Sequence, residues 1–236
     1  MFEAAEIGNK IDKQTYQHEE PRVREALLQV QRRLADSKHS VIIIVGGVEG
    51  AGKSETVNLL LEWMDARGIE VHAFGAPTDE ERERPRYWRY WRLLPPHGKI
   101  GVFFGSWYTD PIVNRTYGKT DDAQLQLELH RITQFERMLH NEGVVLVKIW
   151  MHLAKDVQEK RLKSLHKDPA TRWRITPLTW KYFKKYDDFR KVSEESLRHT
   201  SLGFAPWHVV EAADARYRNL TVASLVLRSI EAALDA

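Results

Sequence analysis

The feature that most constrains the fold of this chain is a glycine-rich segment between an apolar run and a helical pattern. Residues 47–54 read G-V-E-G-A-G-K-S and fit G-x-x-x-x-G-K-[ST] at every defined position. The apolar run 41–45 precedes this segment, and residues 53–66 follow it with helical spacing. A strand, a glycine-rich loop and a helix in this order are the context of a phosphate-binding P-loop. An ordinary strand-to-helix turn is the alternative interpretation, but both flanks favour the P-loop.

The residue types in this loop explain how it would bind phosphate. Glycines let backbone N–H groups turn toward phosphate oxygens, and the N-terminus of the following helix adds partial positive charge. Lys53 adds a full positive charge, and the hydroxyl of Ser54 can ligate Mg²⁺. The candidate phosphate- or nucleotide-binding residues here are Gly47, Gly50, Gly52, Lys53, Ser54 and Glu55.

Strand and helix patterns alternate along the rest of the chain. Short buried strands joined by helical crossovers indicate a parallel sheet with helices on both faces. We therefore expect an α/β fold: a P-loop kinase-like three-layer sandwich with a five-stranded parallel sheet and a helical lid. Residues 1–40 would form a helical extension and residues 41–236 the core, with the lid inserted at about 155–198. Strands are predicted at 41–45, 70–74, 100–104, 144–149 and 207–211, and helices at 21–35, 53–66, 84–94, 122–141 and 217–234.

Length and composition suit one sizeable domain. The 236 residues are 42% hydrophobic and include no cysteine, which excludes disulfides and thiol chemistry and agrees with a cytoplasmic location. The N-terminus lacks the basic-then-apolar order of a signal peptide, and no apolar run approaches the roughly 20 residues of a spanning helix. A net charge of +3 is weak support for polyanion binding, and we expect neither a nucleic acid nor a membrane as partner.

A second informative segment, 81–92, reads E-R-E-R-P-R-Y-W-R-Y-W-R. Pro85 can begin a helix whose aromatic residues share one side and whose arginines share another. Such a helix could simply bury its aromatic side and leave its arginines in solvent. Because it follows a strand end in a P-loop protein, Arg86 and Arg89 are also candidate phosphate ligands, since guanidinium forks match phosphate oxygens.

A third segment, 155–198, is rich in lysine and arginine. Most of these charges would form solvated helix faces, as charge runs usually do. Arg172 and Arg174 differ because they lie in a break between helical stretches, before Pro177. In mononucleotide kinases an insertion at this place is a lid that closes over the phosphates, so both arginines are candidate lid residues.

Together these segments resemble the family-2 polyphosphate kinases, from about residue 20 to residue 234. The chain is most similar to the N-terminal domain of the tandem polyphosphate:AMP phosphotransferases, which carry two such domains in one polypeptide. The matching segments are the P-loop at 47–54, A-P-T-D-E-E at 76–81, R-P-x-x-W-R at 84–89, S-W-Y at 106–108, F-E-R-M-L at 135–139, R-W-R at 172–174 and A-P-W at 205–207.

The resemblance implies an activity and roles for particular residues. It implies transfer of a phosphoryl group from inorganic polyphosphate to an adenine nucleotide, AMP, with Mg²⁺ as cofactor. It also implies a second homologous domain in the native polypeptide, and we expect a homo-oligomer. By resemblance Glu49, Lys53 and Arg115 are catalytic, Glu49 and Ser54 lie near the metal, and Arg172 and Arg174 belong to the lid.

One departure from the family pattern bears on activity. Active relatives have Asp-Arg before Ser-Trp-Tyr, and here Phe104 and Gly105 stand in their place. An aspartate at this strand end normally holds Mg²⁺, which phenylalanine cannot do. Two other functions therefore stay open. The domain could be catalytically degenerate, with a structural or polyphosphate-binding role beside an active C-terminal domain, or it could be an ordinary ATP-dependent nucleotide kinase. Glu49 and Asp110 remain as candidate metal ligands.

Overall fold

The computed structural model describes residues 1–235 and contains one parallel five-stranded sheet, in the order β2-β3-β1-β4-β5. Every predicted strand is present, and β1 and β4 extend beyond their predicted ends because their additional residues are also buried or pair with neighbouring strands. The predicted α/β fold class is thus confirmed. The strands are β1 (Ser40–Gly47), β2 (Ile69–Ala73), β3 (Ile100–Phe104), β4 (Val144–His152) and β5 (Trp207–Glu211).

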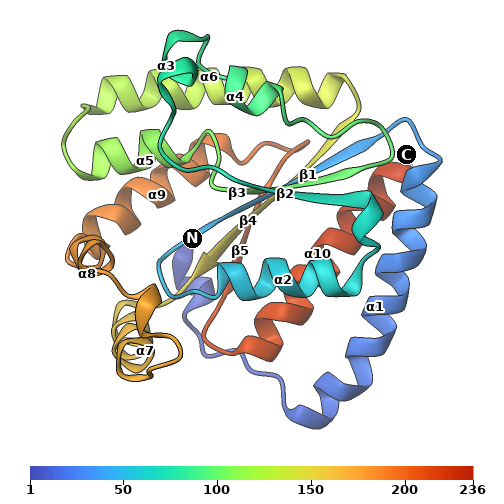
Figure 1. Cartoon of the computed structure of the whole chain (residues 1–236), viewed down its shortest axis with the longest axis horizontal. Coiled ribbons are helices and arrows are strands. Elements are labelled where there is room, and N and C mark those ends of the chain that lie inside the picture. Colours follow the sequence, from blue (N-terminus) through green and yellow to red (C-terminus); the bar gives the residue numbers. More distant parts are fainter. Residues whose placement is uncertain (236) are drawn as a thin grey trace.

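The apolar run in β1 is continuous because both faces of the sheet are covered. Successive side chains of a strand point to opposite faces. Ile43 and Val45 accordingly join the cluster beneath one helical layer, and Ile42 and Ile44 join the cluster beneath the other. Figure 1 shows these two layers on either side of the sheet. One layer contains α1 (Lys13–Ala35), α2 (Lys53–Trp63) and α10 (Ala215–Leu234), and the other contains α5 (Thr109–Thr116), α6 (Asp122–Asn141) and α9 (Tyr186–Thr200).

Two helix predictions were wrong in their bounds, and α5 was not predicted at all. Helix α1 begins before Pro21, because the Asp12 side chain caps it by accepting from the Thr15 amide. Pro21 lies on the exposed face of α1, where solvent can satisfy the carbonyl that loses its amide partner. The predicted helix 84–94 is instead two short helices, α3 (Asp79–Glu83) and α4 (Trp88–Trp91), which are separated around Pro85.

The predicted lid segment consists of several helices. They are α7 (Lys155–Lys167), the single turn η3 (Arg172–Arg174), α8 (Pro177–Phe183) and α9. Helix α9 buries Val192 and Leu197 in the core on the α6 side, whereas α7 and α8 lie at the periphery in Figure 1. The division into extension, core and lid stays a prediction.

The N-terminal segment packs across the ends of β4 and β5. Phe2, in the short turn η1 (Phe2–Ala5), stacks on His152 with 4.5 Å between ring centroids. Glu6 lies 2.7 Å from His152 Nε2, and burial lowers the pKa of this imidazole. The amides of Gly8 and Asn9 donate to the Glu211 carboxylate. This segment is therefore fixed to the carboxyl ends of the strands, where the P-loop also lies.

Candidate functional site

The glycine-rich loop has the geometry of a P-loop. It leaves the end of β1 and enters α2 with Gly52 as the N-cap residue, so the predicted strand, loop and helix are confirmed. The Lys53 ammonium group folds back over the loop and donates to the carbonyls of Gly47, at 3.0 Å, and Val48, at 2.9 Å. The loop and its lysine therefore already have a defined shape in the free chain.

Gly47 is required by both its backbone angle and its surroundings, which leads to a testable prediction. Its φ is +136°, and a Cβ there would overlap the Met151 carbonyl oxygen and lie 2.8 Å from the Met151 amide nitrogen. We expect Gly47→Ala to lower the free energy of unfolding by about 2–3 kcal/mol, because backbone atoms of β4 would have to move. Thermal denaturation should show a decrease in Tm of roughly 4–12 °C.

Gly75→Ala is the matched control, because Gly75 also follows a strand. A Cβ there has no heavy atom within 4 Å, and its φ is not in the left-handed region. We expect its Tm to stay within about 3 °C of the unmodified chain. Equal shifts for the two variants would contradict the steric argument.

Arg218 is a residue at the P-loop that sequence reasoning missed. Its side chain is 3% exposed, and its guanidinium group packs directly over Gly52, where a Cβ would overlap it. Burial lowers the pKa of Arg218, and its Nε donates to Asn219 Oδ1 at 3.2 Å. Helical spacing could have identified it. Arg218 is four and eight residues before Val222 and Val226, so it lies on the buried face of the same helix.

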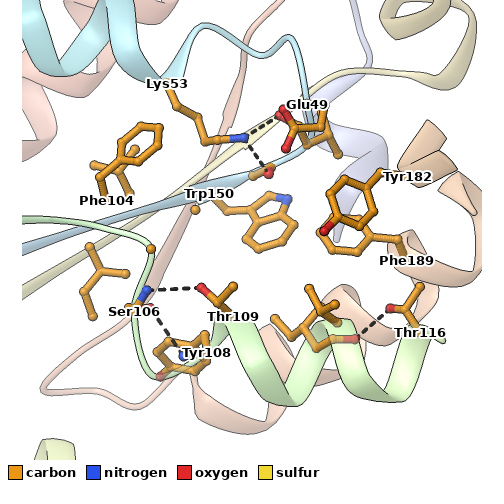
Figure 2. A pocket seen from close by; sticks show the side chains of 18 of the residues that line it. Glu49, Lys53, Phe104, Ser106, Tyr108, Thr109, Thr116, Trp150, Tyr182 and Phe189 are labelled. Atoms are coloured by element: carbon orange, nitrogen blue, oxygen red, sulfur yellow. Dashed lines mark hydrogen bonds between the residues drawn. The ribbon is translucent and has the colours of Figure 1, made fainter. Parts of the chain in front are cut away.

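A cavity of about 330 Å³ opens beside the P-loop. Figure 2 shows it between the loop with Lys53 and the helix that carries Thr109 and Thr116, with Trp150 lying between them. Among the described residues that line it, only Glu49, Lys53 and Lys185 are acidic or basic. Its aromatic lining consists of Phe74, Phe104, Tyr108, Tyr117, Trp150, Tyr182, Tyr186, Phe189 and Trp207.

Phe104 stands at the position where the resemblance to the family implies an aspartate. It is the last residue of β3 and pairs with Val45 of β1, directly before the P-loop. Its ring lines the cavity near Lys53 in Figure 2. The next residue, Gly105, has a φ of +81°, and a Cβ there would lie 3.1 Å from the Phe74 carbonyl oxygen. The backbone at 105 therefore disfavours the arginine that active relatives have.

The Ser-Trp-Tyr segment is held by a buried polar network. Trp107 Nε1 and the Tyr108 hydroxyl donate to Glu136, at 3.0 and 2.6 Å. The Lys148 ammonium group donates to Glu136 at 2.7 Å and to the Thr200 carbonyl at 2.7 Å, and neither ionic side chain is exposed. Burial lowers the pKa of Lys148, and burial with the nearby Glu136 carboxylate raises that of Tyr108. This network fixes the loop after β3 to β4, α6 and the end of α9.

Other predicted residues lie at the P-loop itself. Glu49 lines the cavity, and its carbonyl accepts from Gln158 Nε2 at 2.9 Å. Glu55, in the first turn of α2, accepts from Arg174 Nη1 at 2.6 Å. The structure thus brings Arg174 next to the P-loop, whereas its assignment to a lid and its action on phosphate stay predictions.

The two predicted arginines near α4 have protein partners. Arg86 forms an ion pair with Glu128 on α6. Arg89 donates to the Gly75 carbonyl at 3.0 Å and lies 3.4 Å from Glu81. Neither arginine lines the cavity, so the structure gives both a structural role and leaves phosphate binding as a prediction.

Arg115 and Arg172 are also directed elsewhere. Arg115 donates to Asp122 at 2.6 Å, and this hydrogen bond raises the pKa of Arg115. Arg172 donates to the His166 carbonyl at 3.1 Å on the exposed side of the lid. Within residues 1–235, no arginine lines the cavity, and the catalytic role of Arg115 and the lid role of Arg172 stay predictions.

The residues at the P-loop offer Mg²⁺ few ligands of their own. Nowhere in the described chain do three or more His, Cys, Asp or Glu side chains gather as a metal site. Glu49 and Ser54 are exposed beside the loop, which provides one carboxylate and one hydroxyl. Mg²⁺ usually keeps several waters and binds one or two carboxylates plus substrate phosphates. The site therefore fits an ion that arrives with the phosphates.

Comparisons with known proteins agree on one family. The family model described as Polyphosphate kinase 2 (PPK2) matches residues 10–235. The polyphosphate:AMP phosphotransferase of Pseudomonas aeruginosa is 50% identical over 99% of this chain and 47% of its own length. The AMP/ADP-polyphosphate phosphotransferase of Meiothermus ruber is 30% identical over 88% of this chain and 80% of its own. The crystal structure of polyphosphate kinase 2 from Arthrobacter aurescens superposes with a TM-score of 0.90 at 29% identity, covering 96% of this chain and 82% of that one.

Two further findings concern the length of the chain and the character of its helices. The chain spans about half the length of the curated Pseudomonas relatives it matches, 47% in each case. Across residues 1–235, no helix combines the length and apolar character needed to cross a bilayer.

Proposed function

The chain belongs to the polyphosphate kinase 2 family, and we propose that it moves a terminal phosphoryl group from inorganic polyphosphate to AMP, giving ADP. The observation that supports this most directly is the formed P-loop with Lys53 at the rim of a cavity large enough for a small ligand. The Pseudomonas and Meiothermus relatives are named as phosphotransferases that act on AMP and polyphosphate, which supports AMP as acceptor and polyphosphate as donor.

The proposed reaction needs positioning and charge neutralisation more than covalent chemistry. A phosphate oxygen of AMP attacks the terminal phosphorus of polyphosphate, and the bond from that phosphorus to the bridging oxygen breaks. Lys53 and the N-terminal amides of α2 would bind the transferring group. Mg²⁺, held by Ser54 and Glu49 together with the phosphates, would neutralise their charge. Arg174 would bring the lid over the P-loop through its contact with Glu55.

The decisive test of the activity uses the purified chain with polyphosphate, AMP and Mg²⁺, and measures ADP formation. Replacing polyphosphate by ATP tests the alternative hypothesis that the chain is an ordinary ATP-dependent nucleotide kinase. Transfer from polyphosphate but not from ATP supports the proposal, and transfer only from ATP contradicts it.

A second candidate function is a catalytically degenerate domain that binds polyphosphate or serves structurally beside an active domain. Phe104 favours it, because an aromatic ring lines the cavity where active relatives have a carboxylate. We therefore expect this chain alone to transfer phosphoryl groups slowly.

Restoring the carboxylate should raise the rate. Phe104→Asp is expected to increase AMP phosphorylation by at least roughly tenfold, since a charge-stabilising group at such a site is worth on the order of 10²–10³ in rate. Gly105→Arg is not combined with it, because the positive φ at Gly105 disfavours a side chain there. The measurement is initial ADP formation at saturating substrates, with Phe104→Ala as the control that removes the ring without adding charge.

High activity in the unmodified chain that Phe104→Ala leaves unchanged would contradict this prediction. Glu49 would then be the working metal ligand, because Asp110 is exposed on α5 and does not line the cavity.

The wider context of the chain also belongs to the proposal. The length of the Pseudomonas relatives supports a second homologous domain in the native polypeptide. A homo-oligomer and a cytoplasmic location stay predictions from the sequence.

A further inference from the structure

We propose that Arg218 is a positioning residue for phosphate binding, which supplies a buried positive charge to the P-loop from the α10 side of Gly52. This inference rests on the proposed function for the identity of the anion, the polyphosphate donor. Arg218 does not line the cavity, so it would act through the loop without touching the phosphates. The bound anion, and no carboxylate of the protein, would compensate its charge.

The guanidinium group of Arg218 lies against the point where the P-loop becomes a helix. Gly52 caps α2, and its carbonyl accepts from the Thr56 amide at 3.0 Å in the first helical turn. A Cβ on Gly52 would overlap Arg218 Nη1 and lie 2.5 Å from its Cζ. The positive charge is therefore beside the helix N-terminus whose amides would bind the phosphates.

Contacts with α10 and α2 hold the guanidinium group in this place. Its Nε donates to Asn219 Oδ1 at 3.2 Å, and the same oxygen lies 3.5 Å from the Thr56 hydroxyl on α2. Helices α2 and α10 lie in the same layer of Figure 1. A buried charge is screened much less by salt than an exposed one, and a fixed charge needs no reorganisation when an anion arrives.

The charge of Arg218 lacks the carboxylate that a buried arginine normally has. Arginine stays protonated in proteins, and buried charges are usually paired because their desolvation is costly. Among residues 1–235, no carboxylate forms an ion pair with Arg218, and Glu55 and Asp214 attract it only at longer range. Glu55 instead accepts from Arg174 at 2.6 Å. Asp214 caps α10 by accepting from the Tyr217 amide.

A second arginine adds positive charge near this part of the loop. Arg161 on α7 donates to the Ala213 carbonyl at 3.0 Å, and a Cβ on Gly50 would lie 3.5 Å from its Cγ. The charge of Arg161 opposes the charged form of Arg218, as like charges do. An anion bound at the P-loop would offset this repulsion, which packing alone does not explain.

A merely structural arginine would behave differently from the proposed one. If Arg218 served only to pack and to bond Asn219, its removal would lower the stability of the free chain. If its charge is left uncompensated until an anion binds, an apolar side chain of similar volume should leave the free chain about equally stable or more stable. The two roles therefore predict different changes in Tm.

Calorimetric titration with tripolyphosphate and thermal denaturation of Arg218→Met test the proposal. We expect the Kd for tripolyphosphate to rise at least roughly fivefold, because a charge in partly buried surroundings acts strongly on a nearby anion. The Tm of the free chain should fall by no more than about 3 °C. A smaller rise in Kd, a larger fall in Tm, or an unfolded Arg218→Met chain would overturn the inference.

Two further arginine variants separate the position of the charge from its mere presence. Arg228→Met is the matched control, because Arg228 is an exposed arginine on α10 that lies about 15 Å along the helix from Arg218. Its Kd should stay within about twofold of the unmodified chain, since an exposed distant charge is screened. Arg218→Lys keeps the charge and should bind tripolyphosphate more tightly than Arg218→Met. Equal Kd values in Arg218→Met and either of these variants would overturn the assignment.

Failure of this inference and failure of the proposed function are distinguishable, because tripolyphosphate binding needs no turnover. Weaker tripolyphosphate binding by Arg218→Met, in a chain that forms no ADP, would remove the activity but keep the role of Arg218. ADP formation whose KM for polyphosphate is the same in Arg218→Met would keep the activity but overturn the role of Arg218.

Discussion

Lys53→Ala is expected to lower the rate of phosphoryl transfer by roughly 10²–10³, the usual cost of removing a charge-stabilising group from such a site. The lysine provides a full positive charge beside the phosphate-binding amides, and the helix N-terminus supplies only partial charge. Its ammonium group also bridges the Gly47 and Val48 carbonyls, so the variant loses one tie that shapes the loop. The measurements are kcat for ADP formation and the Kd for polyphosphate.

The binding measurement should be made at two salt concentrations. Affinity for a polyanion falls with salt as counterions are released, and a variant with one cation fewer should show a weaker dependence. Lys160→Ala is the control, since Lys160 is an exposed lysine on α7 that pairs with the exposed Asp156. Unchanged polyphosphate affinity in Lys53→Ala would place the polyanion site elsewhere on the chain.

Lys148→Met is expected to destabilise the fold by about 3–5 kcal/mol, because it would leave the Glu136 carboxylate buried without its cation. For a chain of this size, that corresponds to a decrease in Tm of roughly 6–20 °C. The matched control is Lys160→Met, which breaks an exposed pair worth at most about 1 kcal/mol. Thermal denaturation followed by circular dichroism compares the two.

A double variant separates the cost of an unpaired charge from the cost of lost packing. Lys148→Met with Glu136→Leu removes both charges, and replacing a whole buried pair is often nearly neutral. We expect the double variant to recover at least half of the lost Tm. If it is less stable than Lys148→Met alone, the hydrogen bonds from Trp107 and Tyr108 to Glu136 matter more than the ion pair.

The elements that sequence predicted well are those with strong local patterns. The run 41–45 is apolar throughout because both faces of β1 are covered, and that alone marks a central parallel strand. The glycine spacing of the P-loop is equally local, since the positive φ at Gly47 and Gly52 permits few other residues. Helix α5 was missed because Pro111 and the short polar residues around it give it no clear helical period.

The features that sequence did not predict depend on partners distant in sequence. The ion pair of Arg86 with Glu128 on α6 could not be foreseen, because the two residues are far apart in sequence. The cavity could not be foreseen either, because residues as far apart as Phe74 and Trp207 come from different strand ends and share no periodic pattern. Trp150, which lines the cavity, lies just beyond the predicted strand 144–149 and was not singled out from the sequence.

The two hydrogen bonds of Lys53 have a consequence for the thermodynamics of anion capture. An ammonium group has three N–H bonds, and the carbonyls of Gly47 and Val48 accept two of them. No third acceptor is assigned to it in the described part of the chain, so one N–H is available to a single phosphate oxygen. Binding can then add a contact without dismantling the loop, and the ordering entropy of the lysine side chain has already been lost during folding. Phosphate should therefore bind to a loop that is already ordered. We expect a small entropic penalty for the protein and little change in amide hydrogen exchange around the loop.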